Sequence, residues 1–151
     1  MSCSGAVIAG LVATVIFWVI TRLTTMNLMG MEHYLGAIFT GSRNERLGFV
    51  LLFAGGVVSG LVYAALWSAD IGWIGYRFGL LFGAVQWLIV GFFLGFAPAV
   101  HAGIRAGPAP APGFYMTNLL GGWAFLAGLI NHAIFGLAFV YFYQFFRTRY
   151  G

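Results

Sequence analysis

The residues best suited to chemistry are three polar side chains set inside apolar runs: Gln86, Asn131 and His132. Each lies near the middle of a stretch long enough to cross a bilayer, where polar groups normally face a neighbouring helix. His132 is four residues from both Gly128 and Gly136, so it shares their helical face. We therefore expect an inward, neutral imidazole with Gln86 at a similar depth, close enough to meet it.

Three uses of this group follow from its chemistry. The favoured interpretation is an interhelical hydrogen bond, the commonest use of such side chains in a membrane. The alternatives are an axial ligand for a haem or chlorophyll-type pigment, or part of a proton or substrate pathway. His33 and His101 both fall in predicted loops. A bis-histidine haem within one chain is therefore excluded, and single-ligand or intersubunit binding stays open.

A small charged cluster occupies the first polar loop. It is suited to binding a metal or an anion, although local ion pairing at the headgroup level is the simpler interpretation. Its members are Glu32, His33, Arg43, Glu45 and Arg46.

Catalytic motifs are missing from the sequence. There is no phosphate-binding glycine loop, no HExxH helix and no nucleophile elbow, and Cys3 is the sole cysteine. The remaining acid, Asp70, lies seven residues before Arg77 across a short turn, where the two side chains are placed to pair. We predict that the chain is not an enzyme and holds no metal.

The composition indicates an integral membrane protein. Of 151 residues, 62% are hydrophobic and 7% are charged, against roughly a quarter charged in a soluble domain. The net charge of +4 comes from seven scattered Arg. Scattered cations suit lipid headgroups rather than nucleic acid, which calls for a dense basic patch.

The apolar runs predict an all-α fold made of one transmembrane domain, residues 1–151, with four membrane-spanning helices. Their expected bounds are about 5–22, 47–69, 75–97 and 116–146. The first three are near the roughly 20 residues that a bilayer requires, and the fourth is longer, so we expect it to tilt or to project past the headgroups. The polar loop 23–46 has a moderately apolar middle, Tyr34 to Phe39, that favours a short interfacial or re-entrant helix. The Ala/Pro-rich loop 98–115 favours an extended path.

The two halves of the chain show a faint internal repeat. GLVATVIFWVI at Gly10 to Ile20 aligns with GLLFGAVQWLI at Gly79 to Ile89, which pairs Trp18 with Trp87. A 2+2 pseudo-repeat would relate the halves by an axis along the membrane normal.

Small residues recur at intervals of four along the predicted helices. Lipid supplies no hydrophobic drive for helix association, so such stripes favour close helix packing. The alternative leaves one groove outward for a partner helix, a pigment or a lipid tail. The packing glycines are Gly56, Gly60, Gly79, Gly83, Gly91, Gly95, Gly128 and Gly136.

The order of three segments resembles an uncharacterised family of small bacterial four-helix integral membrane proteins. The segments are TTMNLMGMEHYLGAIFTG, YRFGLLFGAVQWLIVGFFLGFAPAVH and GLINHAIFGLAFVYFY. The resemblance implies four helices and a location in the bacterial inner membrane, and it supplies no activity.

The leading functional hypothesis is an accessory, structural subunit of a larger membrane complex, for example a respiratory or photosynthetic electron-transfer complex. Its expected partners are membrane lipids and larger membrane protein subunits. The alternatives are a small oligomeric channel or carrier lined by Gln86, Asn131 and His132, and a haem- or pigment-binding protein that uses His132. A bound lipid is the further expected ligand.

Overall fold

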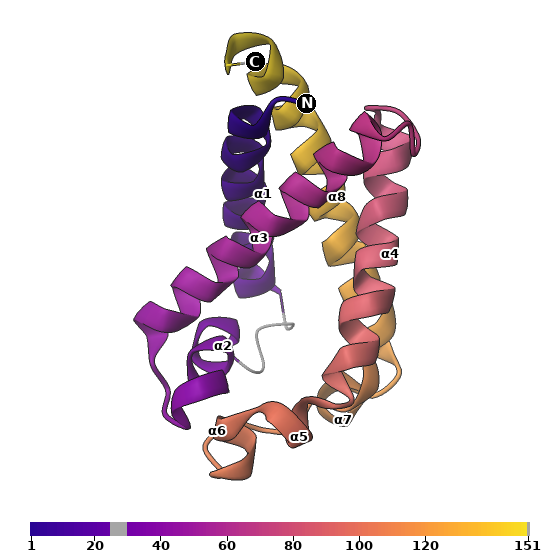
Figure 1. Ribbon diagram of the computed structural model, residues 1–151. Coiled ribbons are helices and arrows are strands. Elements are labelled where there is room, and N and C mark those ends of the chain that lie inside the picture. The colour runs from indigo at the N-terminus through magenta and orange to yellow at the C-terminus, as the bar shows by residue number, and fades with distance from the viewer. Residues whose placement is uncertain (25–29, 151) are drawn as a thin grey trace.

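The computed structural model describes residues 1–24 and 30–150, and its regular structure over these residues is helical (Figure 1). Four helices are long and apolar enough to span a membrane, which fits a multi-pass membrane protein. They are α1 (Cys3–Leu23), α3 (Glu45–Ser68), α4 (Tyr76–Leu94) and α8 (Trp123–Tyr150). The shorter elements are α2 (Met31–Thr40), α5 (Ala97–Val100), α6 (Ala102–Arg105), η2 (Phe114–Met116) and α7 (Thr117–Leu120).

The helix bounds differ most from the sequence prediction at the fourth span. The apolar run from Met116 onward was expected to be continuous helix, but Gly121 adopts φ 62°, ψ −156°. That conformation interrupts the helical hydrogen bonds, so η2 and α7 form separate turns and α8 begins only at Trp123. Within the predicted loop 23–46, the expected short helix is present as α2.

Local capping fixes the starts of two long helices. The Ser2 side chain accepts a hydrogen bond from the Gly5 N–H at 3.1 Å, and Asn44 Oδ1 accepts one from the Leu47 N–H, also at 3.1 Å. Each oxygen satisfies a donor that the first helical turn leaves unpaired. At the C-terminal end of α2, Gly41 takes φ 66° and ends the helix before α3 begins.

The long helices pack as antiparallel neighbours through glycine contacts. A Cβ at Gly10 would lie 3.2 Å from Val57 Cα, where α1 crosses α3. A Cβ at Gly79 would lie 2.7 Å from the Gly136 carbonyl oxygen, where α4 crosses α8. α1 also lies along α8. Because glycine has no side chain, the helix backbones approach each other closely at these crossings.

α3 and α4 do not pack side by side along their length. They meet near the turn 69–75, where Phe82 on α4 lies 5.2 Å from the Tyr63 ring centroid and 5.7 Å from that of Trp67. From there the two helices diverge toward the end that carries α2, α5 and α6 (Figure 1). This divergence creates the space described below.

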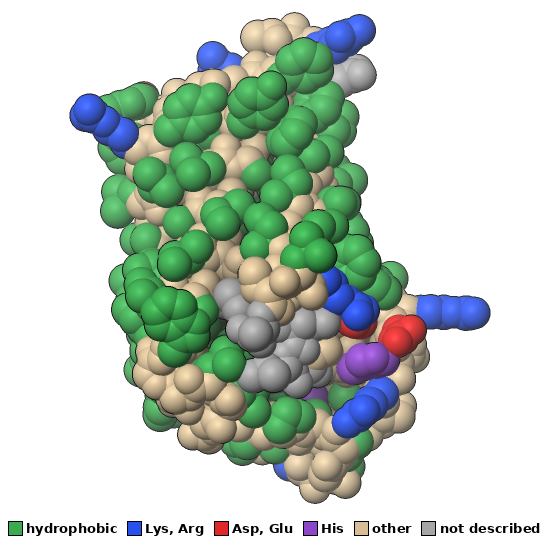
Figure 2. Space-filling view, turned by 180° about the vertical axis from the view of Figure 1, so that it is seen from behind, with side chains coloured by type: hydrophobic (Ala, Val, Ile, Leu, Met, Phe, Trp, Pro, Cys, Tyr) green, Lys and Arg blue, Asp and Glu red, His purple; other side chains and the backbone are tan. Residues whose placement is uncertain are grey.

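On the face drawn in Figure 2, the charged side chains gather toward the two ends of the molecule, and the broad band between them consists of hydrophobic side chains, other uncharged side chains and backbone. Both chain termini lie at one end (Figure 1), where the Ser2 N–H donates to the Tyr143 hydroxyl oxygen at 3.3 Å. An even number of crossings requires this arrangement of the termini. The uncharged band is therefore the part of the surface that suits lipid.

Candidate functional site

A cavity of about 300 Å³ lies where α3 and α4 diverge. α1 and α8 form its inner wall, and α2 and Met116 lie at its outer end. Gly55 and Val90 are exposed at its edge. Its lining is mostly apolar and, among the described residues, includes no Arg, Asp or Glu. Besides Gly55, Val90 and Met116, the cavity is lined by Thr14, Phe17, Thr21, Met31, Tyr34, Leu35, Leu51, Leu52, Gly56, Ser59, Gln86, Trp87, Leu94, Gly128, Asn131, His132 and Phe135.

Gln86 closes the narrow part of this space. Its Nε2 donates to Ser59 Oγ at 3.1 Å, and its Oε1 accepts from the Tyr63 hydroxyl at 2.5 Å. The expected contact between Gln86 and His132 is therefore wrong, because α3 supplies both partners. Ser59 and Tyr63 are one turn apart, so the two hydroxyl groups share a face of α3. That spacing was a signal that the sequence prediction missed.

His132 lies in the cavity wall with its tautomer fixed by the backbone. Nδ1 is 2.9 Å from the Gly128 carbonyl oxygen. Since a carbonyl only accepts, Nδ1 carries the proton. The ring lies 5.0 Å from the Trp87 centroid and 5.2 Å from that of Phe17. Among the described residues Nε2 has no hydrogen-bond partner.

Asn131 is the second unpaired polar group of the cavity. Its side chain is 3% exposed, lines the same space and forms no hydrogen bond with the described part of the chain. Thr14 and Thr21, by contrast, donate to the carbonyls of Gly10 and Trp18. Asn131 and His132 are thus two free polar groups at consecutive positions of α8, and the unpaired hydroxyl group of Tyr34 is a third in the lining.

The eight glycines predicted to pack helices all lie against other parts of this chain. Gly79, Gly83, Gly128 and Gly136 lie in the contact between α4 and α8. Added Cβ atoms at the remaining four would meet Thr14, Phe139, Tyr115 and Phe114, in the order Gly56, Gly60, Gly91 and Gly95. The position that a Cβ would occupy at each of these glycines is thus close to another part of the chain.

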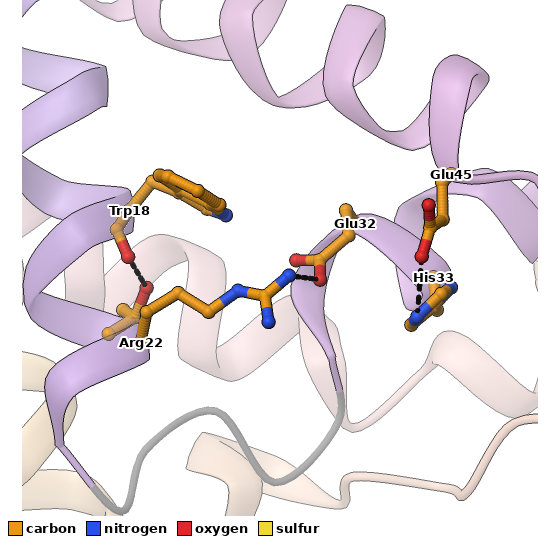
Figure 3. Close-up of polar contacts among 6 residues, drawn as sticks. Trp18, Arg22, Glu32, His33 and Glu45 are labelled. Atoms are coloured by element: carbon orange, nitrogen blue, oxygen red, sulfur yellow. Dashed lines mark hydrogen bonds and ion pairs between the residues drawn. The ribbon is translucent and has the colours of Figure 1, made fainter.

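A charged corner joins α1 to α2 and α3 (Figure 3). Arg22, at the end of α1, forms an ion pair with Glu32, and its Cζ lies 5.3 Å from the Trp18 ring centroid. His33 Nε2 lies 3.1 Å from Glu45 Oε1. Local pairing thus accounts for these acids.

Two further expectations concern charged groups elsewhere. Among the described residues, no group of three or more His, Cys, Asp or Glu is arranged to hold a metal ion. The expected pair between Asp70 and Arg77 is not formed in the described part of the chain. Asp70 instead takes part in the turn after α3, with φ 59°.

A buried aromatic pair that sequence reasoning missed holds α2 against α6. The Tyr34 and His101 ring centroids are 4.3 Å apart, and His101 is 1% exposed. His101 Nδ1 accepts from the Ile104 N–H, so its Nε2 donates to the Tyr34 carbonyl at 2.9 Å. His101 lies between α5 and α6, outside both helices as expected, and its side chain is packed. The two residues are 67 positions apart, and no periodic pattern connects them.

We predict that Tyr34 makes the free energy of unfolding fall at alkaline pH. Burial raises the pKa of its phenol from 10.0 to about 12, and its hydroxyl has no partner in the described residues. A raised phenol pKa stabilises the fold below the unfolded value, and that stability is lost as pH rises through the folded value. Between pH 10 and 12 the wild type should therefore lose up to about 1.4 kcal/mol per pH unit more than Tyr34→Phe. Denaturant unfolding of both proteins across this range measures the difference, and parallel pH profiles would contradict it.

The comparisons with known proteins found no match: no family model, no curated protein and no solved structure is similar to this chain. The resemblance to small bacterial membrane proteins therefore stays a prediction, and the case for function depends on the cavity.

Proposed function

We propose that this protein binds a lipophilic small molecule within the bilayer, in the cavity between α3 and α4. The observation that carries the proposal is the pairing of an apolar space of about 300 Å³ with the free polar groups of Asn131 and His132. Ligand sites of this size typically combine an apolar lining with a few polar groups that fix orientation.

The energetics favour an occupant over an empty space. A polar group that an apolar occupant would cut off from water without a hydrogen bond costs about 1–3 kcal/mol, and Asn131, which is 3% exposed, lines the cavity without a hydrogen bond to the described residues. The lining atoms also lose dispersion contacts when nothing fills the space. A ligand that bonds Asn131 and fills the apolar part removes both costs.

The shape of the site suits entry from the lipid side. Gly55 and Val90 are exposed at the edge of the cavity, on the two helices that diverge. A molecule dissolved in the bilayer would pass between α3 and α4 without crossing a charged surface. Its polar end would reach α8, and its apolar body would lie toward Leu51, Leu94 and Met116.

The channel alternative receives less support from this arrangement. On the terminal side of the cavity, stacked aromatic rings fill the space between the helices, including Trp67 with Phe139 at 6.0 Å and Phe139 with Tyr143 at 5.5 Å. A solute path through one chain would have to displace these rings. An oligomeric channel would need a path between subunits.

Three expectations from the sequence remain proposals. They are the accessory-subunit role, the inner-membrane location and the 2+2 pseudo-repeat. Under the repeat, the contact of α3 with α4 corresponds to the contact of α1 with α8, so the cavity lies where the halves differ. A fixed ratio to larger subunits after purification in mild detergent would support the accessory role. Such a subunit would still carry its ligand in this cavity.

Gly55→Trp tests the proposed function, because it fills the edge of the cavity. Gly55 lines the cavity, and a Cβ there has nothing within 4 Å, so a large side chain fits at this edge without striking backbone. The full-length protein is purified in mild detergent and extracted with organic solvent, and the extract is analysed by mass spectrometry. The wild type should yield one lipophilic compound near one equivalent per chain, and Gly55→Trp should lose most of it.

Gly122→Trp is the matched control, since a Cβ there also meets nothing within 4 Å and lies away from the cavity. It should retain the compound at the wild-type level. Recovery of only bulk phospholipid from the wild type, or equal recovery from Gly55→Trp, would refute the proposed function.

A further inference from the structure

We infer that the ligand of this cavity is an uncharged amphiphile that carries a hydroxyl group, such as a long-chain alcohol, a phenol or a hydroquinone. The inference rests on the proposed function and specifies its ligand class. It comes from the hydrogen-bonding capacity of the two free groups on α8 and from the charge of the lining.

The free nitrogen of His132 is an acceptor. Nδ1 donates its proton to the Gly128 carbonyl at 2.9 Å, so in a neutral ring Nε2 has a lone pair and no hydrogen. A charged ring would be costly in this apolar setting. The occupant must therefore present an O–H or N–H donor to Nε2. A ketone, an ester or an ether cannot provide one.

Asn131 supplies the complementary donor. Its amide has two N–H donors and one acceptor oxygen, and all of them are free of partners in the described residues. A hydroxyl group both donates one hydrogen and accepts others, so its oxygen can accept from Asn131 Nδ2 while its hydrogen goes to His132 Nε2. A hydroxyl group thus matches the free acceptor of His132 and one free donor of Asn131.

The cavity also selects against charged headgroups. No Arg lines it among the described residues, and Gln86 is already bonded to Ser59 and Tyr63. A phosphate or carboxylate would be buried without a counter-ion, which is strongly unfavourable. Ordinary phospholipids therefore fit poorly by their headgroups, whereas a neutral hydroxyl fits.

The test compares two probes that differ by one hydrogen-bond donor, para-dodecylphenol and its O-methyl ether. Both are titrated calorimetrically into the full-length protein after its co-purified compound has been removed by extended detergent washing, and Gly55→Trp serves as the blank for partitioning into micelles. The wild type should bind the phenol about tenfold or more tighter than the ether, the typical effect of leaving a buried acceptor unpaired.

Two variants separate the roles of the two residues. His132→Phe keeps an aromatic ring beside Trp87 and removes the acceptor, so it should abolish the preference for the phenol, with the phenol bound more weakly and the ether at least as tightly as in the wild type. Retained binding of the ether also shows that the cavity is intact. Asn131→Leu removes the donor to the ligand oxygen, so it should weaken both probes by a similar factor.

The outcomes distinguish this inference from the proposed function. If neither probe binds the wild type above the Gly55→Trp blank, the cavity is not a binding site and both proposals fall. If the ether binds as tightly as the phenol, or dodecanoate binds more tightly than both, the site stands and the hydroxyl assignment is wrong. A visible absorption band in the purified protein that disappears in His132→Phe would assign Nε2 to a pigment metal and also overturn the hydroxyl assignment.

Discussion

Gly136→Leu is expected to lower the free energy of unfolding by at least about 3 kcal/mol, the upper part of the range for overpacked interiors. A Cβ at Gly136 would strike the Gly79 carbonyl group, with the carbonyl carbon at 2.8 Å. Backbone cannot rotate away as a side chain can, so α4 and α8 must separate. Because α4 diverges from α3 (Figure 1), its contact with α8 is its main attachment to the rest of the protein.

Titration with dodecyl sulfate, followed by circular dichroism, measures this effect. Gly122→Leu is the matched control, because it adds the same side chain at a glycine with nothing within 4 Å. It should unfold close to the wild type. Equal midpoints for the two variants would mean that α4 and α8 do not meet backbone to backbone at this point.

Arg22→Met is expected to cost about 3 kcal/mol, the lower end for breaking a buried ion pair. Glu32 is 1% exposed at its side chain, whereas Arg22 is 44% exposed. Loss of the guanidinium leaves a buried carboxylate whose Oε2 already lacks a partner. Glu32→Gln should cost less, about 1 kcal/mol, because Arg22 keeps access to water and to the Trp18 ring.

The double variant Arg22→Met, Glu32→Gln completes the thermodynamic cycle. It removes the charge that Arg22→Met alone leaves unpaired, so it should be more stable than Arg22→Met although it carries one more substitution. Unfolding midpoints of the four proteins give the coupling energy. Additive costs would show that the ion pair contributes nothing to the junction of α1 and α2.

The sequence predicted the helical architecture because a span needs only length and apolar composition, which are local properties. The start of the fourth span was wrong by seven residues, since Gly121 takes a positive φ that ends α7, and the apolar pattern around it does not encode that conformation. Glycine at every fourth position predicted close packing, but it did not reveal which pairs of helices would touch.

The candidate site was predicted in part. Asn131 and His132 were recognised as inward-facing polar groups, and the structure places both in a cavity wall. The cavity itself depends on the angle between α3 and α4, which no periodicity encodes. Gln86 was assigned the wrong partner for the same reason, because its neighbours Ser59 and Tyr63 depend on where the two helices cross.

Both termini lie at the end of the molecule opposite α2, α5 and α6 (Figure 1), so the two ends of the four long apolar helices present unequal surfaces. One surface presents two chain ends and a tight turn, and nearly all the shorter folded elements are on the other. Reporter domains fused to either terminus would therefore read out the same compartment and leave the structured surface uncovered. Antibodies raised against that surface would bind from the opposite compartment.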